Sequence, residues 1–580
     1  MQSSTSGKAG QSIGVFALCL FLMIPGSATY SRAGDESNSL TEEEKIVHVL
    51  NRLGFGPRPG DIEKVAAMGL EAYIEQQLHP QEISDPGMEK RLSTFETLKM
   101  TPQELSEFYP APNQLRRQRL QAERQDQGAQ SSPEMEGESA PEETREMQEA
   151  RRQMRAGLQR IRFELSEAKI MRAVYSERQL QEVMSDFWMN HFNVFLAKGL
   201  DRVYTTDFEE NVVRPLALGK FEDLLMATAK SPAMLFYLDN WISTAPAEVM
   251  EERVSALRNR LRSQRRNGTG GQQAERALLR LLQRAKGLNE NYARELMELH
   301  TLGVDGGYSQ EDVIQVAKCL TGWTIAAPRQ GGSFQFRPGL HEDGNKVVLG
   351  HRIRSGGIEE GEQVLRMLAN HPSTARFIST KLVRRFVADD PPADLVDAAS
   401  LTFEKTGGDL REVLRTLFTH PHFFSPEIHQ AKIKKPLELV ASSLRASGAE
   451  IKPAPHLMRM LAEMGEALYM CQEPTGYPDV ASAWINTNSL LKRLNFALAL
   501  ASDRIPQIRV DLASAWPLFQ QLRLPEPSAR QLEQTRSLMG QVGEERNQRG
   551  DLRPDLRPDR FPKQVIASAF MLGSPQFQKR

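Results

Sequence analysis

The stretch DIEKVAAMGLEAYIEQQL, residues 61–78, decides the fold class. Its apolar side chains recur at spacings near the helical period, at Ile62, Val65, Ala66, Leu70, Tyr73, Ile74 and Leu78. Gly69 stands inside this pattern, and glycine weakens a helix interior. We therefore expect two short helices that meet at Gly69.

The same periodicity covers most of the remaining chain. It recurs around 165–192, 221–238, 289–302, 310–322, 360–370, 374–388, 394–405, 409–419, 435–447, 487–502 and 564–572. Long strand-like alternation is nearly absent. The sequence therefore predicts a mostly α protein, a large multi-helix domain over residues 40–580, with Trp188, Leu296, Trp323 and Phe386 in its core.

One segment departs from the helical pattern. Residues 333–337 alternate between apolar and polar side chains, and residues 347–353 are rich in β-branched ones. Between them, residues 338–345 carry the Pro, Gly, Asp and Asn typical of turns. This pattern predicts one small β-hairpin inserted among the helices.

The N-terminal 33 residues have the plan of a secretory signal peptide. Lys8 supplies the positive charge, residues 13–24 are apolar, and small residues surround Ala28 and Ala33. The apolar run is shorter than the roughly 20 residues that a membrane span needs. We therefore predict cleavage near Ala28 or Ala33, export to the periplasm or the extracellular space, and no membrane span in the mature chain.

Composition narrows the choice of partners. The 580 residues carry a formal net charge of −1, so no global field attracts nucleic acid, and none is expected as a partner. Cys319 and Cys471 are the two cysteines left after cleavage. One disulfide and two free buried thiols are both compatible with that number.

Two stretches read as low-complexity insertions into the helical domain. Residues 111–150 are rich in Gln, Glu, Arg, Ser and Pro, a composition that buries too little apolar surface to order itself. Residues 250–285 contain many arginines around a Gly-rich turn, which suggests two amphipathic helices joined by a flexible link.

Two polar clusters lie in apolar surroundings near the N-terminal half. Arg52 shares a helix face with His48 and is a candidate to bind an anionic group or to pair with a buried carboxylate. The aromatic string FWMNHFNVF, residues 187–195, holds His191 and Asn193. His191 is a candidate general base or ligand, and equally a core histidine whose hydrogen bonds are satisfied.

Two further clusters follow. Helical geometry puts Asn291, Glu295 and Glu298 on one stripe of residues 289–303, where two carboxylates can hold a metal or share a proton. His341 and Lys346 flank the expected turn and offer a titratable base and a cation. The sequence has no phosphate loop, HExxH zinc motif or GxSxG elbow, and it leaves metal and cofactor open.

Several strings together closely resemble the bacterial domain-of-unknown-function family numbered 1800. They are HVLNRLGFGPRPGD, FWMNHFNVF, NENYARELMELHTLG, HEDGNKVVLG and HPSTARFISTKLVRRFV, and the resemblance runs from about His48 to Phe577. Members commonly look exported. They are typically encoded beside a second exported, uncharacterised family that resembles sulfatases, so the resemblance implies such a protein as a candidate partner.

Two functions follow from these residues. The first is an exported hydrolase of a cell-envelope or extracellular polymer, with His191, Glu295, His341 and Lys346 as catalytic residues. Arg52, Asn193, Asn291 and Glu298 would then bind the substrate. The second is a non-catalytic binding or assembly partner of another exported protein, in which the same clusters fix helix packing. Convergence in one water-accessible pocket favours the enzyme.

Overall fold

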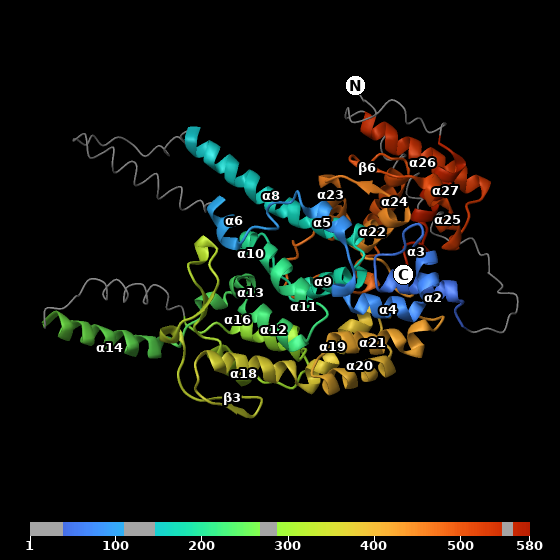
Figure 1. Cartoon of the computed structure of the whole chain (residues 1–580). Coiled ribbons are helices and arrows are strands. Elements are labelled where there is room, and N and C mark those ends of the chain that lie inside the picture. The colour runs from blue at the N-terminus through green and yellow to red at the C-terminus, as the bar shows by residue number, and fades with distance from the viewer. Residues whose placement is uncertain (1–38, 109–144, 267–286, 548–560) are drawn as a thin grey trace, which may run out of the picture.

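A computed structural model describes residues 39–108, 145–266, 287–547 and 561–580 (Figure 1). The predicted signal peptide lies outside these ranges. Of the two predicted insertions, 111–150 is described only from Arg145, and 250–285 only as far as Arg266. Both stay predictions.

Helices make up most of the described chain, which confirms the mostly α prediction. The helices outside the paragraphs below are α5 (Pro86–Leu92), α6 (Pro102–Phe108), α10 (Asp201–Asp207), α11 (Arg214–Leu216) and α14 (Ala247–Arg266). Short 3₁₀ turns are η1 (Pro80–Glu82), η4 (Asn240–Ile242), η6 (Pro328–Gln330), η7 (Pro338–Leu340), η8 (Pro421–Phe424) and η9 (Ala481–Ala483).

The N-terminal helices form one side of the body. They are α2 (Glu42–Arg52), α3 (Asp61–Met68) and α4 (Leu70–Leu78). The predicted break at Gly69 is confirmed, because α3 ends before this residue and α4 begins after it, with a φ of 90° that favours glycine. Helix α4 packs on α21 (Leu410–Thr419), more than 300 residues later in the chain.

A long helix reaches the centre of the molecule. The segment predicted around 165–192 is two helices, α8 (Arg145–Tyr175) and α9 (Gln179–His191). Figure 1 shows α8 running inward from the periphery. It contacts α22 (Pro436–Ala446) and α23 (Pro455–Glu463).

The middle of the chain contains two π-helical turns. The first is η3 (Phe208–Val213), between α10 and α11. The helix predicted at 289–302 starts as α16 (Glu290–Glu295) and continues as the π-helical turn η5 (Leu296–Thr301). It contacts α17 (Gln310–Cys319) and α18 (Ile358–Ala369). Helix α12 (Phe221–Lys230) packs on α18 and on α13 (Pro232–Tyr237).

The strands are short antiparallel pairs. The two segments predicted to form one hairpin pair with different partners: β2 (Phe334–Phe336) with β1 (Trp323–Ile325), and β3 (Lys346–Val348) with β4 (His351–Ile353). The sequence pattern marked the strands but missed β1, because that strand follows directly after α17. A third pair joins β5 (Glu450–Ile451) and β6 (Ile508–Arg509).

The C-terminal half completes the core. Helices α19 (Pro372–Phe386) and α20 (Ala393–Thr406) pack on each other and α20 packs on α21, while α24 (Thr487–Ala501), α25 (Leu512–Gln521), α26 (Ala529–Asn547) and α27 (Lys563–Gly573) group at one end (Figure 1). Residues 578–580 then pair with 432–434.

The predicted core is confirmed, since Trp188, Leu296, Trp323 and Phe386 are fully buried. Cys319 and Cys471 are free buried thiols. No helix in the described ranges combines the length and the apolar character that a membrane crossing requires.

Candidate functional site

His191 is the last residue of α9, and both of its ring nitrogens have partners. Nε2 lies 3.2 Å from the carbonyl oxygen of His300, and Nδ1 lies 2.8 Å from Nζ of Lys381. A carbonyl oxygen only accepts, so Nε2 carries the hydrogen and Nδ1 accepts one from the lysine. Burial lowers the pKa of His191 well below its ordinary value. We therefore assign a neutral ring with a fixed tautomer.

Lys381, on α19, forms no ion pair with a carboxylate of the described ranges. It is partly exposed, and no carboxylate of the described ranges lies within ion-pair distance of its Nζ. Burial lowers its pKa to about 8, with Arg384 adding to the decrease and the charge of Asp479 opposing it. About one tenth of this side chain is therefore a free amine at pH 7.

The π-helical turn η5 brings His300 beside this pair. The rings of Phe192 and His300 are 5.1 Å apart, and burial followed by the charge of Lys381 lowers the pKa of His300 to about 3. Phe377 of α19 covers Gly303, where an added Cβ would lie 2.9 Å from the ring. Segments 187–195, 289–303 and 371–387 thus meet at one place. We call Lys381, His191 and His300 the lysine–histidine site.

Asn193 and its neighbour Asn190 attach the 471–477 loop to this site. Asn193 Nδ2 donates to the carbonyl oxygens of Cys471 and Glu473 at 3.1 and 2.8 Å. Asn190 forms two hydrogen bonds with the backbone of Tyr477, at 2.7 and 2.8 Å. A Cβ on Gly476 would lie 2.2 Å from the oxygen of Asn190, so this loop needs glycine there.

The predicted acidic stripe lies at the entry to η5. Asn291 is exposed, and Glu295 and Glu298 are half-buried. Burial and then the charge of Glu298 raise the pKa of Glu295. Tyr237 lies between the two regions, because it is hydrogen-bonded to Asn193 and its pKa is raised by burial and, to a smaller extent, by the charge of Glu295. No group of three or more His, Cys, Asp or Glu side chains within the described ranges is arranged to hold a metal ion.

His341 and Lys346 lie in a separate, closed cluster with Glu360 of α18. His341 Nε2 is 3.1 Å from Oε1 of Glu360, and Lys346 Nζ is 2.5 Å from Oε2. The two partners lower the pKa of Glu360 to about 2, although burial alone would raise it. All three side chains are buried. We call them the Glu360 triad.

Arg52 is fully buried beside a group of paired charges. Its Nη2 donates to the carbonyl oxygen of Ile428 at 2.7 Å, while Nε and Nη1 have no hydrogen-bond partner among the described residues. Nearby, Glu438 pairs with Arg385 and Arg580. Arg52 therefore faces carboxylates and other arginines inside the protein.

Sequence reasoning missed Lys381 and Glu360, which decide the character of the two clusters. Both stood inside predicted helices, at 374–388 and 360–370, where charged side chains are usually solvent-facing. Lys381 follows Phe377 by one helical turn, and this spacing puts the two side chains on the same face of the helix.

Comparison with known proteins adds the family. The family described as "Protein of unknown function (DUF1800)" matches residues 48–579. The chain belongs to the DUF1800 family. The match includes every segment that builds the lysine–histidine site. No curated protein and no solved structure matches the chain.

Proposed function

We propose that this DUF1800 protein is an exported hydrolase whose reactive group is the amine of Lys381. One observation carries the proposal: Lys381 is a partly exposed lysine, hydrogen-bonded to a neutral histidine and lacking an ion-pair partner in the described ranges. A lysine that is desolvated and lies near other cations is activated as a base or nucleophile.

The amine acts as a general base toward an ester or amide. With a pKa of about 8, about one tenth of Lys381 is neutral at pH 7. The neutral amine takes a proton from water while the water oxygen bonds to the carbonyl carbon. The bond to the leaving group then breaks, and the leaving group takes its proton from the Lys381 ammonium.

His191 positions the lysine in this scheme. Both of its ring nitrogens are occupied, so it cannot itself take a proton from water without losing a contact. It accepts a hydrogen from Nζ and keeps the amine at one place. Asn193, Glu295, Glu298 and Asn291 are proposed to contact the substrate, whereas His341 and Lys346 are proposed to support the fold.

Export follows from the signal peptide predicted at residues 1–33, and the sulfatase-like protein remains a proposed partner. The second candidate function is a non-catalytic assembly protein. The observation that favours it is the Glu360 triad, whose buried polar groups form ion pairs and hydrogen bonds with one another.

Ester hydrolysis tests the proposal. Wild-type protein is assayed with 4-nitrophenyl acetate and butyrate across the pH range, beside Lys381→Met and a control, Lys405→Met, at an exposed lysine. We expect a rate that rises with a midpoint near pH 8 and falls about a hundredfold or more in Lys381→Met. An equal rate in all three proteins contradicts the proposal.

The positioning role of His191 has its own readout. His191→Gln keeps one donor and one acceptor, and we expect it to retain the midpoint of the pH profile. His191→Leu removes the acceptor, so the lysine loses its fixed place and the midpoint shifts. Identical profiles for the two variants would remove His191 from the scheme.

A further inference from the structure

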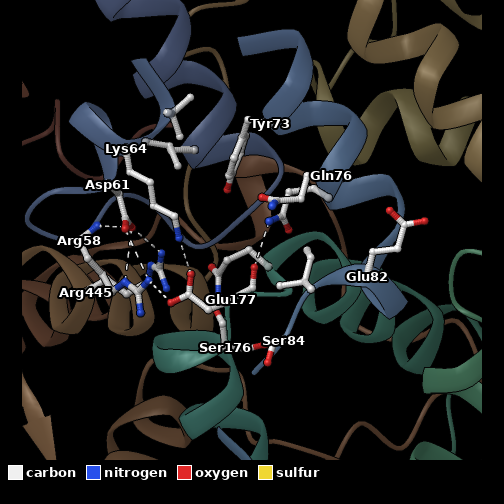
Figure 2. A pocket seen from close by; sticks show the side chains of 15 residues that line it. Arg58, Asp61, Lys64, Tyr73, Gln76, Glu82, Ser84, Ser176, Glu177 and Arg445 are labelled. Atoms are coloured by element: carbon white, nitrogen blue, oxygen red, sulfur yellow. Dashed lines mark hydrogen bonds and ion pairs between the residues drawn. The ribbon is translucent and has the colours of Figure 1, made fainter. Parts of the chain in front are cut away.

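A hollow of about 330 Å³ lies between α3, α4, the turn after α4 and the start of α9 (Figure 2). Polar side chains line it, among them Arg58, Lys64, Tyr73, Gln76, Ser84 and Glu177. Its volume is at the lower end of the range for small-molecule sites. None of the residues of the lysine–histidine site lines it. We call it the α3–α4 pocket.

Ion pairs within the pocket involve most of its charged groups. Glu177 accepts from Arg58 at 2.6 Å and from Lys64 at 2.8 Å. Burial alone would raise the pKa of Glu177, but these two cations lower it to about 2. Behind them, Arg445 of α22 donates to Asp61 at 3.0 Å. With Glu82 at the rim, the lining carries three cations and three carboxylates.

The hydroxyl of Tyr73 also lines the pocket but takes part in none of these ion pairs. Tyr73 is 7% exposed, its hydroxyl has no hydrogen-bond partner in the described ranges, and Figure 2 shows that hydroxyl pointing into the pocket toward Glu177. A buried tyrosine hydroxyl usually finds a partner. The pocket therefore contains a hydroxyl that is available to donate and to accept a hydrogen bond.

We propose that the α3–α4 pocket binds a saccharide. An ionic ligand would have to separate Glu177 from Arg58 and Lys64, and the charges of the lining sum to zero, so they select neither sign. A neutral polyol adds hydrogen bonds to the remaining lone pairs of the carboxylates and leaves the ion pairs intact.

The groups at hand suit hydroxyl recognition. The carboxylate of Glu177 accepts, the guanidinium of Arg58 and the amide of Gln76 donate, and the hydroxyls of Tyr73 and Ser84 do both. This proposal is independent of the hydrolytic function, because the two sites share no residue.

Titration calorimetry with N,N′-diacetylchitobiose, cellobiose and maltose tests the proposal on the full chain. Tyr73→Phe removes only the unpartnered hydroxyl, so the fold should be unaffected. Tyr308→Phe, a half-buried tyrosine outside the pocket, is the matched control. We expect at least one sugar to bind, and its affinity to fall about tenfold in Tyr73→Phe and to stay unchanged in Tyr308→Phe.

Three results would overturn the proposal. They are no binding of any of the sugars at millimolar concentration, binding that Tyr73→Phe leaves unchanged, and binding that phosphate or citrate displaces. An insoluble-polymer pull-down with cellulose and chitin then separates a free sugar from the end of a chain as the natural ligand.

Discussion

The Glu360 triad and the lysine–histidine site both contain lysine and histidine, yet the charges around these side chains differ. In the triad, Glu360 stands between His341 and Lys346, at 3.1 and 2.5 Å. In the lysine–histidine site, Lys381 contacts His191 directly at 2.8 Å. A carboxylate beside a desolvated lysine favours the ammonium, whereas desolvation without such a partner lowers the lysine pKa. We infer that the counter-charge distinguishes the cluster proposed to be structural from the one proposed to be reactive.

The largest effect is expected on removing the carboxylate of the triad. Glu360→Gln leaves the Lys346 ammonium buried without its counter-charge, which should lower the free energy of unfolding by about 3–5 kcal/mol. Urea unfolding measures this change. Glu359→Gln, at the exposed neighbouring position, is the control, and its effect should stay within about 0.5 kcal/mol. Equal effects of the two variants would contradict the structural role of the triad.

Acid should remove the contribution of Glu360 gradually. Its pKa is about 2 in the folded protein, below the ordinary value of 4.5, so the stabilisation is complete above about pH 5. It is lost as the pH falls through about 2, and amounts to roughly 3 kcal/mol. We expect the urea midpoints of wild type and Glu360→Gln to converge between about pH 5 and pH 2. A constant gap would show that the carboxylate is not the cause.

Lys381→Met should have the smallest effect on stability. No ion pair is lost, and a desolvated cation is replaced by an apolar side chain of similar length, so the free energy of unfolding should change by less than about 1 kcal/mol. Lys346→Met is the matched variant. It leaves the buried Glu360 carboxylate without this lysine and should lower the free energy of unfolding by about 3–5 kcal/mol. If the two lysine variants unfold alike, the difference between the clusters is not electrostatic.

Much of the fold could be predicted from the sequence, because the local periodicity of apolar residues indicates helices. The break at Gly69 and the buried Trp188 and Trp323 follow directly from that pattern. The pairing of β1 with β2 could not be predicted in this way, since it depends on the position of the chain after the end of α17.

The site could be predicted only in part. His191 and Asn193 were found because polar groups inside an aromatic string are conspicuous. Their partner Lys381 lies 190 residues later, and no local pattern reports a contact over that separation. The π-helical turn at Leu296–Thr301 was also missed, so positions around the helix after Glu295 could not be derived from α-helical geometry.

The most direct test is the pH dependence of Lys381 acylation in the folded protein. Trace labelling with acetic anhydride, read by peptide mass spectrometry, gives a rate for each lysine at each pH, with Lys405 as the exposed reference. We predict a midpoint near pH 8 for Lys381. A Lys381 acylation rate without a midpoint near pH 8 would contradict the reactive amine on which the proposed function depends.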